Sequence, residues 1–98
     1  KHGSYYYRTE ISWDSRPNDR SEVDKLVARL QRTTGTRGLL VSMSGFTEGV
    51  AKEIKYQMPN HVILVISPEE IREVLKGSVR LESLIEEKEA NLFLSAVA

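Results

Sequence analysis

Residues 36–47 read Thr36-Arg37-Gly38-Leu39-Leu40-Val41-Ser42-Met43-Ser44-Gly45-Phe46-Thr47, and they say more about the architecture than any other part of the chain. Residues 38–44 are mostly continuous rather than alternating apolar sequence, which is typical of a strand covered on both faces of a sheet. Ser44 and Gly45 then interrupt the run, and Thr47 stands where it can cap a following helix. This stretch therefore predicts a buried strand that leads directly into a helix.

A second buried strand is expected a short way downstream. The helix that starts after Thr47 has one apolar line along it, formed by Val50, Ala51, Ile54 and Met58, with Phe46 placed to pack back over its first turn. Residues 61–66 are expected to form another such strand, which is continuously apolar after His61. Strand, helix and strand in this order predict a parallel crossover and hence an α/β fold.

The sequence before this unit predicts one more strand and one more helix. Residues 5–13 are rich in aromatic and β-branched residues and are followed by turn formers over residues 14–19. From Ser21 onward, apolar residues recur at the spacing of an amphipathic helix: Val23, Leu26, Val27 and Leu30.

The sequence after the unit predicts two helices. Ser67-Pro68-Glu69-Glu70 has the form of a capping box with proline at the first helical position. We expect the helix that follows to bury Ile71, Val74 and Leu75 and to stop at Gly77. The next helix carries Leu81, Leu84 and Ile85 above an acidic run, Glu86-Glu87-Lys88-Glu89, which we expect to be solvated.

Bulk composition excludes several classes of protein. The 98 residues, 40% of them hydrophobic, suffice for one domain, and no linker or repeat divides them. The absence of cysteine excludes disulfides and cysteine-bound zinc, and no apolar run approaches the roughly 18–20 residues of a membrane span. We therefore expect a cytoplasmic domain without a membrane partner.

Charge is balanced overall but not along the chain. Fourteen basic residues match fourteen acidic ones, whereas residues 1–37 hold eight basic against five acidic side chains and residues 38–98 hold six against nine. The basic excess of the first part includes residues that could form a rim for phosphates: Arg16, Arg20, Lys25, Arg29 and Arg32. The ordinary alternative is a solvated cationic helix face.

Strand alternation places Glu10 and Ser12 on the same polar face. A strand carboxylate such as Glu10 can bind a hard divalent cation, although a surface ion pair with Arg8 explains it equally simply. Residues 42–49 lead into a helix N-terminus that could attract an anion. Their glycines and Thr47 also suit a plain tight connection, and the sequence there is not a Walker loop.

Taken together, Thr9-Glu10-Ile11-Ser12-Trp13, the helix from Ser21 and above all residues 36–47 resemble the Mrr-like restriction endonuclease family of the PD-(D/E)XK superfamily. The resemblance covers nearly the whole chain and implies a restriction-endonuclease-like fold: a central mixed sheet with parallel crossover strands, flanked by helices. It further implies one domain over residues 1–98 that belongs to a larger protein and lacks the N-terminal portion of the family fold.

The resemblance also implies a site. Glu10 matches the family's metal-binding glutamate, and Ser12 stands at the position of the catalytic lysine. Lys25, with Arg8 as the second choice, is the candidate for a displaced lysine, and no acidic residue precedes Glu10 to serve as the family's aspartate. The implied cofactor is Mg²⁺ or Mn²⁺ bound through Glu10, and the residues expected to contact nucleic acid are Arg8, Arg16, Arg20 and Arg29.

Two functions follow as alternatives. One is metal-dependent phosphodiester hydrolysis on nucleic acid, with DNA as the expected partner, a homodimer as a possible assembly and an aspartate supplied from upstream. The other is a degenerate, non-catalytic nuclease fold that binds nucleic acid or protein inside a larger sensor or defence protein. The serine at position 12 lacks the positive charge that would stabilise a developing phosphorane, so enzyme activity is left open.

Overall fold

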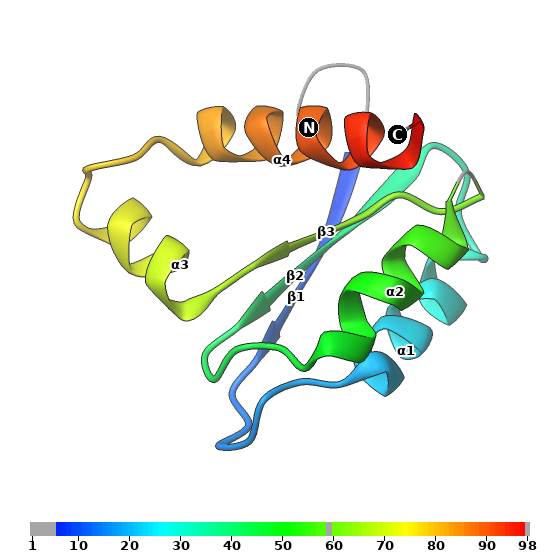
Figure 1. The fold of residues 1–98 in the computed structure, drawn as a ribbon, viewed down its shortest axis with the longest axis horizontal. Coiled ribbons are helices and arrows are strands. Elements are labelled where there is room, and N and C mark those ends of the chain that lie inside the picture. The colour runs from blue at the N-terminus through cyan, green and yellow to red at the C-terminus, as the bar shows by residue number, and fades with distance from the viewer. Residues whose placement is uncertain (1–5, 59, 98) are drawn as a thin grey trace.

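The computed structural model describes residues 6–58 and 60–97. These residues form, in chain order, β1 (Tyr6–Ser12), α1 (Arg20–Leu30), β2 (Thr36–Ser42), α2 (Glu48–Gln57), β3 (Ile63–Ile66), α3 (Pro68–Leu75) and α4 (Leu81–Val97) (Figure 1). The strands lie in the order β1-β2-β3, and both pairings are parallel. The α/β prediction and the parallel crossover are thus confirmed, whereas the described sheet holds only parallel pairs instead of the expected mixture.

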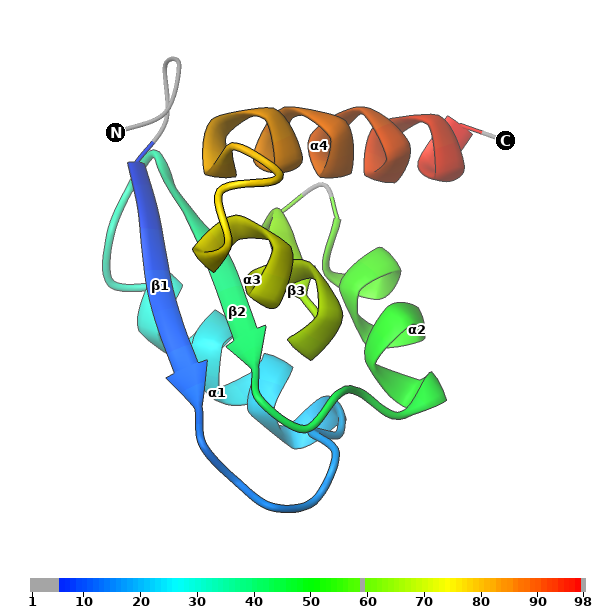
Figure 2. The same cartoon turned by 90° about the vertical axis from the view of Figure 1, so that its left-hand side faces the viewer.

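Helices cover both faces of the sheet. Figures 1 and 2 show α1 and α2 together on one face, with α3 and α4 on the other. Along β2, the side chain of Leu40 packs on the α1 side, and those of Leu39 and Val41 pack on the α4 side. This alternation explains why Leu39, Leu40 and Val41 form a continuous apolar run, since each of them meets a helix layer.

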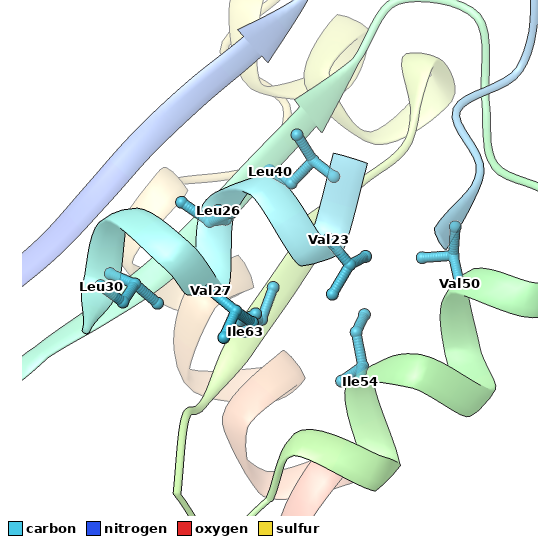
Figure 3. Packing of buried hydrophobic residues seen from close by; sticks show 8 residues of the cluster. All are labelled: Val23, Leu26, Val27, Leu30, Leu40, Val50, Ile54 and Ile63. Atoms are coloured by element: carbon cyan, nitrogen blue, oxygen red, sulfur yellow. The ribbon is translucent and has the colours of Figure 1, made fainter. Parts of the chain in front are cut away.

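The larger core cluster lies between α1, α2 and the sheet. Figure 3 shows its eight buried residues, which come from α1, β2, α2 and β3: Val23, Leu26, Val27, Leu30, Leu40, Val50, Ile54 and Ile63. All four apolar positions predicted for the helix from Ser21 are buried. Phe46 packs against the same cluster, as expected, while Ala51 is exposed because it lies off the buried side of α2.

Two helix starts are capped by side chains. The Asp19 carboxylate accepts a hydrogen bond from the Ser21 amide (3.0 Å) at the start of α1, and its bonds to Ser21 lower the pKa of that carboxyl. The predicted capping box of α3 is present, since Ser67 Oγ accepts from the Glu70 amide (3.2 Å) and the Ser67 amide donates to Glu70 (2.9 Å). Thr47 is the N-cap residue of α2, but its side chain makes no capping bond.

Two predictions about the last two helices, the burial of the α3 side chains and the solvation of the acidic run, were wrong in part. No residue of α3 is fully buried: Ile71 and Val74 are partly buried against the core cluster on that face of the sheet, and Leu75 is 77% exposed. Leu81 is exposed at the start of α4, while Leu84 and Ile85 are buried. The acidic run is only partly solvated, since Lys88 binds Glu70 and Glu89 binds Arg37.

The predicted strand positions fall partly outside the described residues. Tyr5, the first residue of the predicted strand over residues 5–13, lies outside them. Within residues 6–58 and 60–97, no helix has both the length and the apolar character needed to cross a membrane.

Candidate nucleic-acid interface

The polar side of β1 and the basic side of α1 face each other across a shallow depression. Because β1 and β2 are parallel, α1 must return across the sheet in the opposite direction, and this brings its Lys25 and Arg29 beside the strand. The depression measures about 290 Å³, and the residues around it are Glu10, Ile11, Ser12, Trp13, Asp14, Glu22, Lys25, Arg29 and Leu40. Four predicted site residues, Glu10, Ser12, Lys25 and Arg29, are therefore neighbours.

Two guanidinium groups hold the carboxylate of Glu10. Arg8 Nε donates to Glu10 Oε1 at 3.1 Å, and Arg29 Nη1 donates to the same oxygen at 2.8 Å. Arg8 reaches Glu10 because residues two apart in a strand share a face. The simpler reading of Glu10, an ion pair with Arg8, is therefore confirmed, and Arg29 adds a second cation from the adjoining helix.

Ser12 has a structural partner of its own. Its Oγ accepts a hydrogen bond from Asn18 Nδ2 at 2.8 Å. Asn18 is only 3% exposed, and its backbone is tied to the turn after β2, because its amide donates to Gly45 (2.9 Å) and its carbonyl accepts from Thr47 (2.9 Å). Ser12 thus anchors the loop between β1 and α1 at the carboxyl edge of the sheet.

Lys25 lines the depression without bonding to the strand. Its Nζ lies 3.4 Å from Glu22 Oε1, one turn earlier in α1. The side chain is more than half exposed, which leaves the ammonium group accessible from solvent above Glu10 and Ser12.

Arg16 and Arg20 are not part of this depression. Arg16 lies in the exposed loop before α1 and lines a second depression of about 380 Å³, which adjoins the first through Asp14 and Glu22. Arg20 is the exposed first residue of α1. The structure therefore groups Arg8 and Arg29 with Glu10 and separates the other two predicted contacts from it.

The turn between β2 and α2 satisfies its own polar groups. Ser42 is fully buried, and its Oγ donates to the Gly45 carbonyl (2.8 Å) while accepting from the Ser44 amide (3.2 Å). Gly45 has a φ of +93°, which disfavours any residue with a Cβ. These bonds support the plain reading of residues 42–49 as a tight connection.

A third depression of about 340 Å³ lies between α2, β3 and α4. Most of its lining is apolar, including Val50, Ile54 and Leu92, with Lys55 and Lys88 also present. It contains none of the residues predicted to act on nucleic acid.

Within the described ranges 6–58 and 60–97, no three aspartate, glutamate or histidine side chains gather into a group able to hold a metal ion. Magnesium binding by Glu10 stays a prediction. Asn18 is the residue of this region that sequence reasoning missed. An asparagine after proline reads as a turn former, and nothing in the sequence indicates that its loop folds back onto residues 45–47.

No family model matches the chain, and comparisons with curated proteins and with solved structures likewise gave no match.

Proposed function

We propose that the face formed by β1 and α1 binds the phosphate backbone of nucleic acid, with DNA as the expected partner, in a domain of restriction-endonuclease-like type. One observation carries the proposal: Lys25 and Arg29 line one depression together with Glu10, and the Glu10 carboxylate holds the guanidinium groups of both Arg29 and Arg8. Arg8 and Arg29 are each about half exposed, so N–H donors not used by Glu10 can reach a ligand.

The chemistry of these side chains suits phosphate. Guanidinium groups present donors in a planar fork that matches two phosphate oxygens, and a neighbouring lysine adds a mobile point charge. A carboxylate that orients two arginines reduces the side-chain entropy lost when they bind. The resemblance of residues 9–13 and 36–47 to Mrr-like endonucleases supports the choice of nucleic acid over other anions.

Binding without hydrolysis is the form of this function that the contacts favour. Ser12, at the position of the family's lysine, uses its hydroxyl to accept a bond from Asn18. Glu10, at the position of the metal-binding glutamate, is engaged by two cations. Both side chains therefore make structural contacts that do not involve a bound metal.

Metal-dependent phosphodiester hydrolysis is the second candidate, because Lys25 lines the same depression as Glu10 and Ser12. A lysine displaced from the strand onto the next helix would stand on this side of β1. In this case Glu10 would bind Mg²⁺ or Mn²⁺ together with an aspartate from elsewhere, and Lys25 would orient the attacking water.

The proposed binding is tested by fluorescence anisotropy with a labelled 20-base-pair duplex at several salt concentrations. We expect Arg29→Ala to weaken binding several-fold and to reduce the slope of log K against log salt by about 1, as loss of one phosphate contact does. The matched control is Arg80→Ala, which removes an equally positive, 82% exposed side chain between α3 and α4. Equal effects of the two substitutions, or no binding by the wild type, would contradict the proposal.

Glu10→Gln separates the two candidates. If the face only binds backbone, the substitution removes a negative charge from the depression and strengthens DNA binding. If the chain is a nuclease, the same substitution abolishes saturable Mg²⁺ binding in calorimetry together with any cleavage. The two candidates therefore differ in measurable ways, one in DNA affinity and the other in Mg²⁺ binding and cleavage, and Glu87→Gln on the exposed side of α4 controls for the change in net charge.

A further inference from the structure

Trp13 is a large aromatic residue exposed beside the proposed phosphate contacts. It directly follows β1, where the chain leaves the sheet for α1 (Figure 2), and it is 76% exposed. It borders the same depression as Lys25 and Arg29, and so does Ile11, which is 52% exposed. The depression therefore combines the two kinds of side chain that bind single-stranded nucleic acid, an aromatic ring for a base and cations for phosphates.

The backbone on both sides of Trp13 is fixed by hydrogen bonds. The Ser12 carbonyl accepts from the Met43 amide (3.1 Å), and the Asp14 carbonyl accepts from the Ser44 hydroxyl. Trp13 is therefore held at its backbone while most of its surface stays in water. A tryptophan has only two side-chain torsions to order, so it can bind a flat partner at a low cost in conformational entropy.

We propose that Trp13 stacks on an unpaired base of single-stranded DNA while Arg29 and Lys25 bind adjoining phosphates. The stacking contact rests on the proposed function, because it takes the phosphate contacts of that function as given. It adds the class of nucleic acid that the site prefers, which is a strand with accessible bases over a duplex.

Base pairing decides whether Trp13 can contribute to binding. In a duplex, neighbouring bases cover both faces of each interior base, so an exposed ring reaches a base only after that base has been unstacked. In a single strand the faces are open, and every type of base can stack on an aromatic side chain. A duplex would therefore use only the charged side chains, whereas a single strand would use these and Trp13.

The charges around the depression favour a contact that does not depend on charge. Glu10, Asp14 and Glu22 border it together with Lys25 and Arg29. These carboxylates offset part of the attraction between the basic side chains and phosphate, so phosphate contacts alone provide limited affinity. Stacking on the neutral indole ring is not offset in this way, and it would supply much of the affinity for a single strand.

The first test uses the tryptophan fluorescence of the full chain. Trp13 is the only tryptophan in the sequence, so this signal reports on one side chain. We expect a single-stranded oligothymidylate to quench it in a saturable way, and a duplex of the same length to quench it much less at equal occupancy. An abasic deoxyribose-phosphate strand of that length has the charge without the bases, and we expect it to bind without quenching.

The second test compares affinities for the two forms of DNA by fluorescence anisotropy. Trp13→Ala should lower the ratio of single-strand affinity to duplex affinity about tenfold, as the loss of one stacked base does, whereas Trp13→Phe should keep most of that ratio. The matched control is Tyr56→Ala, which removes another aromatic side chain, 79% exposed on α2, and should leave the ratio unchanged. Circular dichroism checks that each variant is folded, as expected for residues this exposed.

Failure of the stacking contact can be told apart from failure of the proposed function. If both forms of DNA bind and Arg29→Ala weakens binding, but Trp13→Ala leaves the affinity ratio unchanged, the stacking contact alone is overturned. Equal quenching by duplex and single strand would also overturn it, because Trp13 would then not select unpaired bases. If neither form of DNA binds, the proposed function fails, and the stacking contact fails with it.

Discussion

Asn18 joins three separate segments of the chain. Its side chain donates to Ser12 at the end of β1, and its backbone bonds to Gly45 and Thr47 in the turn before α2. Asn18 Oδ1 is buried and has no hydrogen-bond partner among the described residues. A position with this many fixed contacts tolerates little change, so the carboxyl edge of the sheet depends on one side chain from an otherwise exposed loop.

We predict that Ser12→Ala destabilises the domain by about 1–3 kcal/mol, the usual cost of leaving a buried donor unsatisfied. Here the donor is Asn18 Nδ2, which has lost its acceptor. The measurement is urea denaturation at neutral pH, with exposed Ser15→Ala as the control that should change the free energy of unfolding by less than about 0.5 kcal/mol. An unchanged midpoint for Ser12→Ala would show that Ser12 is not an anchor.

The residue scale is also where sequence reasoning is least complete. Sequence reasoning singled out Glu10, Ser12, Lys25 and Arg29, which line one depression in the structure because strand alternation and helix periodicity determine which side chains share a face. It did not give the Arg29 contact to Glu10 or the partner of Ser12. Both depend on how a helix or loop returns across the sheet, which no local pattern records.

At the level of elements, α1 packs closely against β2 at Gly38. A Cβ at Gly38 would lie 2.8 Å from Leu26 Cδ2 and 3.2 Å from Ile63 Cγ1. Leu26 is itself 1% exposed and cannot move aside without displacing its neighbours. The missing side chain at Gly38 therefore lets α1 approach the sheet.

We predict that Gly38→Ala destabilises the domain by about 1–3 kcal/mol through overpacking between α1 and β2. In a Leu26→Ala background the same substitution should cost clearly less, because the two atoms nearest to the new Cβ, Leu26 Cδ2 and Cγ, are gone and only Ile63 Cγ1 remains. The four proteins form a double-mutant cycle measured by urea denaturation. Strictly additive effects would mean that Leu26 does not set the distance between α1 and β2.

Predicting the elements themselves succeeded where periodicity and capping agree. The continuous runs gave β2 and β3, and the capping box gave the start of α3. The prediction for Leu75 failed because an apolar residue in the last turn of a short helix fits the pattern whether or not a partner covers it. The prediction that the acidic run is fully solvated failed because Arg37, which binds Glu89, is 52 residues away from it in sequence.

At the scale of the whole molecule, the carboxylate of Glu89 makes polar contacts between α4 and the sheet. Glu89 binds Arg37 of β2 (2.6 Å) and accepts a hydrogen bond from the Tyr7 hydroxyl of β1, while Arg37 also lies over the Phe93 ring (5.5 Å). Arg37 and Glu89 are only 13% and 19% exposed, so solvent screens this ion pair less than those on the surface. The contact connects the two ends of the chain across the sheet.

The contact between Tyr7 and Glu89 makes the stability of the domain depend on pH. Burial, followed by the hydrogen bond to Glu89, raises the pKa of Tyr7 from 10.0 to about 12. A raised pKa in the folded state means that the contribution of Tyr7 to stability is complete below pH 10 and is lost as the pH rises toward 12. Alkaline conditions should therefore release α4 from β1 in that interval.

We predict that Glu89→Gln moves the pKa of Tyr7 down toward 10, although burial still holds it above that value, and that stability is then lost at lower pH. The same change leaves Arg37 without its carboxylate and should lower the free energy of unfolding at pH 7 by about 1.5–3 kcal/mol, as expected for a hydrogen bond to a charged group. NMR titration of Tyr7 measures the first effect and urea denaturation the second. Glu87→Gln, on the exposed side of the same helix, should leave both unchanged. If the Tyr7 titration were the same in the wild type and in Glu89→Gln, burial alone would account for the shift, and α4 would be held by its apolar contacts rather than by Glu89.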